Sequence, residues 1–418
     1  MAIGYACLTI GVPQTDISRC TLKKATPEHM KAIIEANIVA LDKMIDYNSR
    51  NNIKLFRICS EIIPFASHEV NQIKWWELYQ EELKLLGTKI KGLGIRVSMH
   101  PGQYTVLNSP DSRVVHNAMK DLVYHERFLS SLGMDHSNKL VLHIGGVYGN
   151  KAKAMKSFVK NYSFLPQEIK NRLIIENDDK NYHIEDVLVI HECTGVPVVF
   201  DNLHHKVNPP LKYLTDDQWI KQCKNTWRVL DGTQKIHYSQ QKAGGALGSH
   251  SDTIKLQEFV DYYSHLSEDM VDIMLEVKDK NLSAIKCINT VTNKTTAKEL
   301  EVEWERYKYL ILSRSGRLYQ EIEEMLKEQE KVAAMEFYQR IETALTLVEN
   351  AGAEVNAAQH IWGYFSVDCS KAERNRYEKL LDTYQNRNGS INAVKNHLLK
   401  CAKERENKYL VNSLYFYI

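Results

Sequence analysis

Eight short runs of alternating or β-branched apolar residues recur along the first 280 positions, each followed by a longer amphipathic stretch. The runs are GYACLTIG (4–11), KLFRICS (54–60), IRVSMH (95–100), KLVLHIGG (139–146), RLIIEND (172–178), VPVVFDN (196–202), QKIHYS (234–239) and VDIMLEV (271–277). Such runs predict strands, whereas stretches such as PEHMKAIIEANIVALDKMIDYN have the apolar spacing of a helix. Strand and helix alternating eight times predict an α/β fold, a parallel (β/α)₈ TIM barrel.

The pattern changes near Gly316, where the alternating runs stop. The stretches YQEIEEMLKEQEKVAAMEFYQRIETALTLVENAG and INAVKNHLLKCAKERENKYLVNSLYFYI have helical spacing instead. We therefore expect a barrel domain over residues 1–317 and a small all-α C-terminal domain over 318–418. Because all eight strands precede Arg317, a chain that ends there is expected to fold and keep its activity.

Composition narrows the class of protein only slightly. The net charge of +2 argues neither for nor against a nucleic-acid partner. The start of the chain has no signal-peptide pattern, and no apolar run approaches the ~20 residues that span a bilayer. The eight cysteines are scattered without a C-x-x-C pair, which favours reduced thiols and a cytoplasmic protein without a membrane partner. A monomer is expected.

Side chains that can bind metal ions follow almost every predicted strand. They are His100, His143, Glu176, Asp201, His204, His237, His250 and Glu276. In a TIM barrel the active site is built at the C-terminal ends of the strands, so these residues are expected to meet in one pocket.

Each residue also has a structural interpretation: a single histidine can be a hydrogen-bonded structural group, and Glu176 can cap a helix. Many imidazoles and carboxylates buried together, however, are costly without a cation between them. Histidine and carboxylate ligands without thiolate suit Mn²⁺, Zn²⁺ or Fe²⁺. About eight ligands exceed the need of one ion, so two or three ions are expected, as in enzymes that hydrolyse phosphodiesters.

Lys235 and the pair Lys151 and Lys153 are further candidates for the predicted site. Lys235 lies two residues before His237 and points to the same side of its strand. It is expected to be neutral, turned away from the metals or converted to a carbamate, or else to be a core lysine paired with a carboxylate. Lys151 and Lys153 begin the run KAKAMKSFVK after a predicted strand. They are either part of a solvated helix face or phosphate contacts.

The motifs together resemble the ultraviolet-damage endonuclease family. The resemblance is carried by IGYACLT, RICSEIIPFASH, SMHPGQYTVLNSP, VLHIGGVYGNK, IIENDD, PVVFDNLHH, KIHYS, GSHSD and LEVKDK, in that order. It implies a metal-dependent DNA repair nuclease, with Mn²⁺ as the expected ion. Such an enzyme nicks DNA immediately 5′ of cyclobutane pyrimidine dimers and 6-4 photoproducts and leaves a 3′-hydroxyl and a 5′-phosphate. The resemblance also implies abasic sites as further substrates.

The resemblance also implies roles for individual residues. His100, His143 and Glu176 would hold one ion; Asp201, His237 and Glu276 a second; His204 and His250 a third. Glu176 and Glu276 would be bridges. Glu176, Lys235 and His68 would be catalytic, with His68 positioning phosphate or water; as an alternative, His68 caps the next helix.

The Pro101–Gly102 turn is expected to lift Gln103 and Tyr104 towards DNA. There the pair would wedge into a duplex that a photoproduct has made easy to unstack. As an alternative, Tyr104 packs on the barrel rim. Tyr5 is a further candidate for the lesion pocket, or a core residue.

Two other functions fit parts of the pattern. A sugar isomerase or epimerase uses a similar barrel with two metal ions, but the lysines around this rim favour a polyanion. A DNA-binding protein without catalysis would not need the complete ligand set. In the C-terminal region, the motif from His360 to Phe365 resembles an uncharacterised helical domain that accompanies photolyases. That domain has either a packing or a DNA-binding role.

Overall fold

The computed structural model describes residues 1–266, 271–292, 296–328, 333–386 and 389–418. The chain divides into two compact units, which are described separately. The barrel unit contains Met1–Thr9, Gln14–Ile254 and Asp261–Ile285. The helical unit contains Ile10–Pro13, Lys255–Val260 and Lys286–Ile418.

All eight predicted strands are present, and they are parallel. They are β1 (Ile3–Ala6), β2 (Leu55–Ile58), β3 (Arg96–Met99), β4 (Leu140–His143), β5 (Leu173–Glu176), β6 (Val198–Val199), β7 (Lys235–Tyr238) and β8 (Asp272–Leu275). Their order is β6-β5-β4-β3-β2-β1-β8-β7. A parallel bridge between Asp201 and His237 joins β6 to β7 and closes the barrel. The predicted TIM barrel is therefore confirmed.

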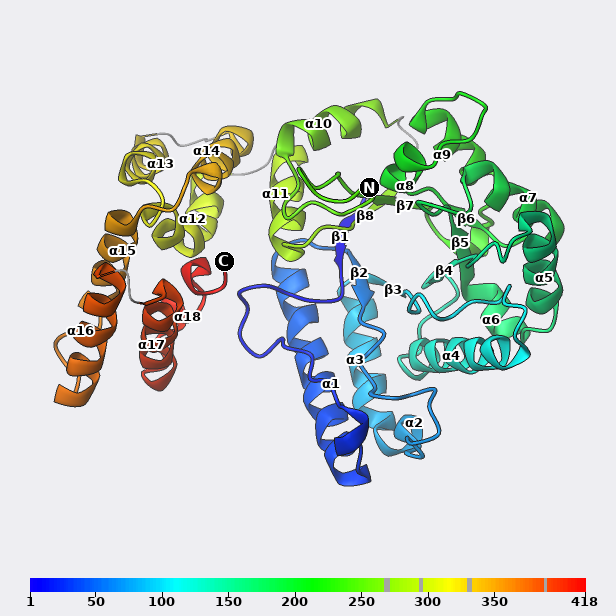
Figure 1. Cartoon of the computed structure of the whole chain (residues 1–418), viewed down its shortest axis with the longest axis horizontal. Coiled ribbons are helices and arrows are strands. Elements are labelled where there is room, and N and C mark those ends of the chain that lie inside the picture. The colour runs from blue at the N-terminus through cyan, green and yellow to red at the C-terminus, as the bar shows by residue number, and fades with distance from the viewer. Residues whose placement is uncertain (267–270, 293–295, 329–332, 387–388) are drawn as a thin grey trace. The chain divides into compact units, whose positions relative to one another are not determined.

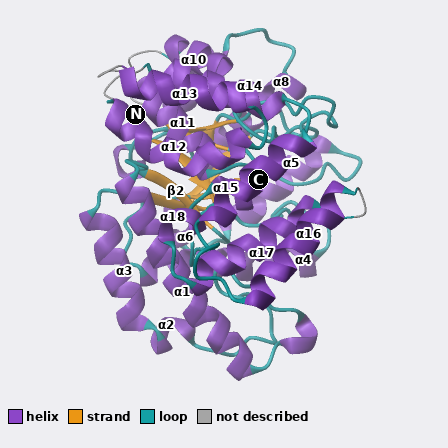
Figure 2. Cartoon of the chain, turned by 90° about the vertical axis from the view of Figure 1, so that its left-hand side faces the viewer, coloured by secondary structure: helices purple, strands orange, loops and turns teal. Residues whose placement is uncertain are grey.

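Helices surround the strands on the outside of the barrel (Figure 1). They are η1 (Leu22–Lys24), α1 (Pro27–Arg50), α2 (Trp75–Leu78), α3 (Gln80–Gly92), α4 (Ser112–Ser131), α5 (Lys151–Ser163), α6 (Gln167–Arg172), α7 (Ile184–Thr194), α8 (Asn202–Val207), α9 (Asp216–Lys224), η2 (Val229–Asp231), α10 (Leu256–His265) and α11 (Asn281–Val291). Helices, purple in Figure 2, make up far more of the chain than the strands, which are orange in the same view. Every described strand residue except Arg57, Arg96 and His143 is fully buried.

Local sequence accounts for where these elements begin and pack. Helix α1 begins after Thr26, whose side chain accepts a hydrogen bond from the His29 amide, and Pro27 occupies the first helical position. Gly4 allows β1 to approach β2 closely, because a Cβ atom there would lie 1.8 Å from the Leu55 carbonyl oxygen. This approach is part of what keeps the barrel narrow enough for side chains to fill it.

The N-terminal ends of the strands contain buried ion pairs. Lys139 precedes β4 and donates hydrogen bonds to the Asn171 carbonyl oxygen, at 2.8 Å, and to Asp231. Asp231 also accepts from the Arg228 side chain at 2.9 Å. Burial tends to raise the pKa of Asp231, but its bonds to Arg228 and Lys139 hold that pKa below the ordinary value. These charges are thus matched within the protein.

The helical unit contains only helices among its described elements. They are α12 (Ala297–Leu312), α13 (Gly316–Glu328), α14 (Ala334–Thr346), α15 (Ala351–Gly363), α16 (Lys371–Gln385), α17 (Ile391–Glu404), α18 (Lys408–Val411) and η3 (Leu414–Phe416). Its core includes Trp362 stacked on Tyr377, with ring centroids 4.2 Å apart. The expected all-α region is confirmed, and α12 groups with it by compactness. The functional boundary at residue 317 stays a prediction. No described helix is both long and apolar enough to cross a membrane.

Candidate metal centre

The barrel brings the predicted metal ligands to the C-terminal ends of its strands. His143 and Glu176 are the last residues of β4 and β5. His100 and Glu276 directly follow β3 and β8, and Asp201 follows β6. His204 lies in the short helix α8, and His250 in the loop after β7.

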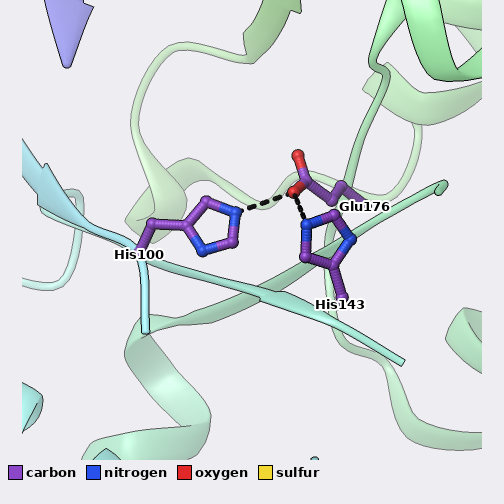
Figure 3. Close-up of side chains that lie close together, drawn as sticks. All are labelled: His100, His143 and Glu176. Atoms are coloured by element: carbon purple, nitrogen blue, oxygen red, sulfur yellow. Dashed lines mark hydrogen bonds and ion pairs between the residues drawn. The ribbon is translucent and has the colours of Figure 1, made fainter. Parts of the chain in front are cut away.

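Glu176 lies beside both His100 and His143, and one of its oxygens interacts with each of the two imidazoles (Figure 3). Its Oε1 atom lies 2.8 Å from Nε2 of His100 and 2.9 Å from Nε2 of His143. Its Oε2 atom lies 2.5 Å from Nδ1 of His237. Burial favours the neutral acid, but His237, His143 and His100 together hold the pKa of Glu176 well below its ordinary value. Glu176 is therefore a carboxylate with ligand atoms on both sides.

The donor atoms fall into two groups that can each hold an ion. One group is His100, His143 and Glu176; the other is Glu176, Asp201 and His237, and within each group the atoms lie within 4.8 Å of one another. Glu276 lies beside the second group, because its Oε1 atom is 3.2 Å from Nδ1 of His237. Glu176 is common to both groups, as expected of a bridging ligand.

Several of these donor atoms are buried without a hydrogen bond. They are Glu176 Oε2, Asp201 Oδ2, and both ring nitrogens of His237. Burying unsatisfied polar atoms costs free energy, and a buried carboxylate costs most. A cation bound by one ring nitrogen of His237 and by the two carboxylate oxygens would satisfy those three atoms, so the residues present fit divalent metal ions.

Hydrogen bonds orient two of the histidines as ligands. Nδ1 of His100 lies 3.0 Å from the Pro101 carbonyl oxygen, and Nδ1 of His204 lies 2.9 Å from that of Asn177. Because a carbonyl oxygen only accepts, each Nδ1 carries the proton, and each Nε2 keeps its lone pair for a metal. Asn177 in turn bonds the backbone of Asp201 in both directions, which ties β5 to β6.

His204 and His250 extend the cluster beyond the two groups. The ring centroid of His204 lies 5.8 Å from that of His143 and 6.4 Å from that of His250. His250 Nδ1 lies 3.9 Å from Glu276 Oε2. Burial lowers the pKa of His204, but Asp201 and the two glutamates outweigh it and raise that pKa to about 9. The same carboxylates would attract a further cation, which would take the place of the proton on His204.

Arg57 was not among the predicted site residues, yet it contacts the cluster. It lies in β2 and donates a hydrogen bond from Nη1 to Glu276 Oε1. Burial opposes the charged guanidinium, but Glu276 and other acidic groups raise the pKa of Arg57. A charged residue inside the apolar run KLFRICS is the signal that could have identified it.

Lys235 is buried in β7, with 2% of its surface exposed. No described residue forms an ion pair with it, so the alternative of a lysine paired with a carboxylate is not supported. Burial, followed by the charges of Arg96 and Arg57, lowers the pKa of Lys235 to about 7. The group is therefore partly neutral near pH 7.

Gln103 and Tyr104 project from the loop between β3 and α4, which we call the recognition loop (residues 100–111). Gln103 is exposed, and Tyr104 is 83% exposed. Both line a cavity of about 640 Å³ that also includes His143, so the loop lies beside the metal ligands. Tyr104 does not pack on the barrel rim.

The predicted phosphate contacts lie at the start of α5. Lys151 is the first residue of this helix and forms an ion pair with Asp186. Lys153 is exposed, and its amide is capped by Asn150. Two other rim lysines, Lys242 and Lys278, pair with Asp252.

Two of the predicted site residues, Tyr5 and His68, do not lie in the metal-ligand cluster. Tyr5 is completely buried, and its hydroxyl donates to Asn48 Oδ1 at 2.8 Å. Its assignment to a lesion pocket is corrected: its ring packs against Phe56 in the core. His68 is exposed, and its Nδ1 accepts from the Val70 amide at 3.1 Å. The structure does not bring His68 to the metal cluster, and its catalytic role stays a prediction.

Comparisons with known proteins agree with this geometry. Residues 2–305 match the family described as UV-endonuclease UvdE, and residues 308–418 match a protein of unknown function (DUF1722). The UV DNA damage endonuclease of Clostridium perfringens is 42% identical over 348 residues, covering 82% of this chain and 83% of that protein. Its counterpart from Bacillus cereus strain Q1 is 31% identical and covers 65% of this chain and 86% of that protein.

A solved structure agrees as well. The crystal structure of SacUVDE is 35% identical, with a TM-score of 0.66, and the match covers 70% of this chain and 98% of that one. These findings favour the nuclease over the sugar isomerase. The chain, with its cluster of candidate metal ligands at the C-terminal ends of the barrel strands, belongs to the UV-endonuclease UvdE family.

Proposed function

We propose that this protein is a metal-dependent endonuclease that nicks duplex DNA immediately 5′ of ultraviolet photoproducts. The substrates are cyclobutane pyrimidine dimers and 6-4 photoproducts, with abasic sites as further substrates. The products carry a 3′-hydroxyl and a 5′-phosphate. The observation that carries the proposal is the buried cluster around Glu176, whose carboxylate lies between three imidazoles.

The cluster would hold two or three divalent ions, with Mn²⁺ as the proposed metal. His100, His143 and Glu176 serve the first ion, and Asp201, His237 and Glu276 the second. His204 and His250 serve a third. When bound, such ions lower the pKa of a water molecule and neutralise charge on the phosphodiester.

The residues of the chain then have separate roles. Glu176 and Glu276 would be the ligands common to neighbouring ions. Arg57 binds Glu276, so one oxygen of this carboxylate is fixed in position. Lys235, when neutral, can accept a proton or carry a carbamate beside the cluster, and the charged form is disfavoured there by Arg57 and Arg96. His68 positions phosphate or water from the loop after β2.

Recognition rests on deformability of the damaged duplex. A photoproduct stacks poorly, so separating it from its neighbours costs less than separating normal bases. Gln103 and Tyr104 enter the vacated space, since both are exposed on the same loop. Lys153 and Lys151 contact the phosphates at the start of α5.

The test is an incision assay with a mapped product. A duplex with a single pyrimidine dimer is incubated with the protein and Mn²⁺, and the nick is located at nucleotide resolution. A nick immediately 5′ of the dimer, absent with EDTA, is expected. No incision beside the dimer with or without metal would refute the proposal. Falling affinity for plain duplex with rising salt would further separate it from a sugar isomerase.

The proposal also covers the role of the helical unit, the cellular location and the oligomeric state. The helical unit either stabilises the barrel or adds DNA contacts, and a chain that ends at Arg317 tests this directly. Retained folding and incision would favour a separate accessory role. A cytoplasmic monomer remains the expected state.

A further inference from the structure

A second cavity is also lined by Tyr104, which lines the first. It has a volume of about 400 Å³, and its lining includes Ser67, Tyr104, Thr105, Asp121 and His125. The cavity lies between the recognition loop, the loop after β2 (residues 59–74) and helix α4. Two separate loops therefore approach one helix face beside the proposed wedge.

Asp121 of α4 joins these two loops. Its Oδ2 atom accepts a hydrogen bond from Thr105 Oγ1 at 2.7 Å, and its Oδ1 atom accepts one from Ser67 Oγ at 3.0 Å. Nδ1 of the buried His125 lies 3.6 Å from Oδ2 and 2.7 Å from the Asp121 carbonyl oxygen. Asp121 is thus bonded through both carboxylate oxygens, and its own helix supports it.

Thr105 couples this anchor to the exposed wedge. It is 7% exposed, whereas the preceding residue, Tyr104, is 83% exposed. The Thr105 amide donates to the Gly102 carbonyl oxygen at 2.9 Å, which closes a turn around Gln103 and Tyr104. A hydrogen bond from the next side chain to a carboxylate therefore fixes the base of the turn.

We infer that Asp121 is a positioning residue for lesion recognition, which holds Tyr104 in its projecting geometry through Thr105. The inference rests on the proposed function. A wedge discriminates well between damaged and undamaged duplexes only if it is already ordered before it binds, because ordering it on binding would cost conformational entropy. Without the anchor, the turn samples other conformations, and the advantage of the damaged duplex decreases.

The experiment compares Thr105→Val with Thr105→Ser in the full chain. Valine keeps the shape and removes the hydroxyl, while serine keeps the hydroxyl. Affinities for a dimer-containing duplex and the matched undamaged duplex are measured at fixed salt. We expect Thr105→Val and Asp121→Ala to lower the damaged-to-undamaged ratio about five- to twentyfold. Thr105→Ser should restore most of it.

A matched control is Thr88→Val, because Thr88 is an exposed residue of α3 whose hydroxyl donates only to the Lys84 carbonyl oxygen. This control should leave the ratio unchanged. Equal weakening on both duplexes by Thr105→Val, or an unchanged ratio, would overturn the inference. A parent protein that shows no preference for the dimer would instead refute the proposed function itself.

The decisive arm uses a background in which Gln103 and Tyr104 are both replaced by alanine. Because the anchor acts through Tyr104, adding Thr105→Val there should cause no further loss in the ratio. A further loss of the same size would show that Thr105 and Asp121 act independently of the wedge, and the inference would fail. Circular dichroism melting of each variant shows whether the barrel remains folded.

Discussion

The two ends of the barrel both bury charged side chains, but they satisfy them differently. At the N-terminal end, Lys139 and Asp231 are 2% and 0% exposed and bond to each other. Arg96 binds Asp272 at 3.0 Å, and Asp272 also accepts from the Ala2 amide at 2.8 Å. Every charge in this set has an opposite charge or a hydrogen-bond partner within the protein.

At the C-terminal ends of the strands, the same degree of burial leaves several ring nitrogens and carboxylate oxygens without a hydrogen bond. Both ring nitrogens of His237 and one oxygen each of Glu176 and Asp201 have no hydrogen bond. These carboxylate oxygens and ring nitrogens have too few N–H and O–H groups around them to form hydrogen bonds with all of them. The contrast indicates that one end is built to be complete by itself, while the other is built to be completed by cations.

The largest expected effect comes from Glu176→Gln. We expect incision at a dimer to fall by more than about a thousandfold, because the amide cannot bridge two ions. Binding to the damaged duplex should remain, since phosphate contacts are unaffected. Single-turnover incision and gel-shift assays measure both. Glu168→Gln, at an exposed position of α6, is the control. Turnover within about tenfold of the parent would show that Glu176 is not a bridge.

The second prediction addresses the N-terminal end. Asp231→Asn leaves the Lys139 ammonium buried without an anionic partner, so the free energy of unfolding should fall by about 3–5 kcal/mol. Bound metal per protein should not change. Urea unfolding and elemental analysis check the two results. The double replacement Lys139→Met and Asp231→Leu should cost less than Asp231→Asn alone. If the single change proves harmless, the pair is not what stabilises this end.

The third prediction concerns metal ions as part of the fold. Mn²⁺ at a hundred times its dissociation constant should raise the free energy of unfolding by about 2.7 kcal/mol, and EDTA should reverse this gain. The free energy of unfolding of the Asp231→Asn protein should rise by as much as that of the parent, because the ligands at the C-terminal ends of its barrel strands are intact. The Glu176→Gln protein should gain less than half. An equal gain in all three would mean that the ions bind elsewhere.

The smallest effect is expected at the recognition loop, which lies beside the candidate metal ligands. Replacing Gln103 and Tyr104 by alanine removes a base–aromatic contact of about 1–3 kcal/mol, so affinity for dimer-containing DNA should fall about five- to a hundredfold. Affinity for undamaged duplex and metal content should hardly change. Competition binding at fixed salt measures the ratio. Equal weakening on both duplexes would indicate a general binding defect rather than a lost wedge.

Much of this architecture can be read from local pattern. The eight apolar runs predict all eight strands, and the side chains that follow them predict the metal ligands, because parallel strands in a barrel end at one face. The elements are shorter than the runs, however. VPVVFDN contributes only Val198–Val199 to β6, and Asp201 pairs with His237 beyond the regular strand.

The sequence alone therefore determined the fold class, the helical C-terminal region and which polar side chains gather at the C-terminal ends of the strands. Tertiary structure decided which side chains became partners: Arg57 with Glu276, Asp121 with Thr105 and Ser67, and Asp252 with the rim lysines. It also placed Tyr5 in the core. The physical reason is that periodicity records which side of an element a residue faces. How deeply a side chain is buried, how it is oriented and which group it bonds depend on strands and loops that are distant in the chain. These meet only when the barrel closes.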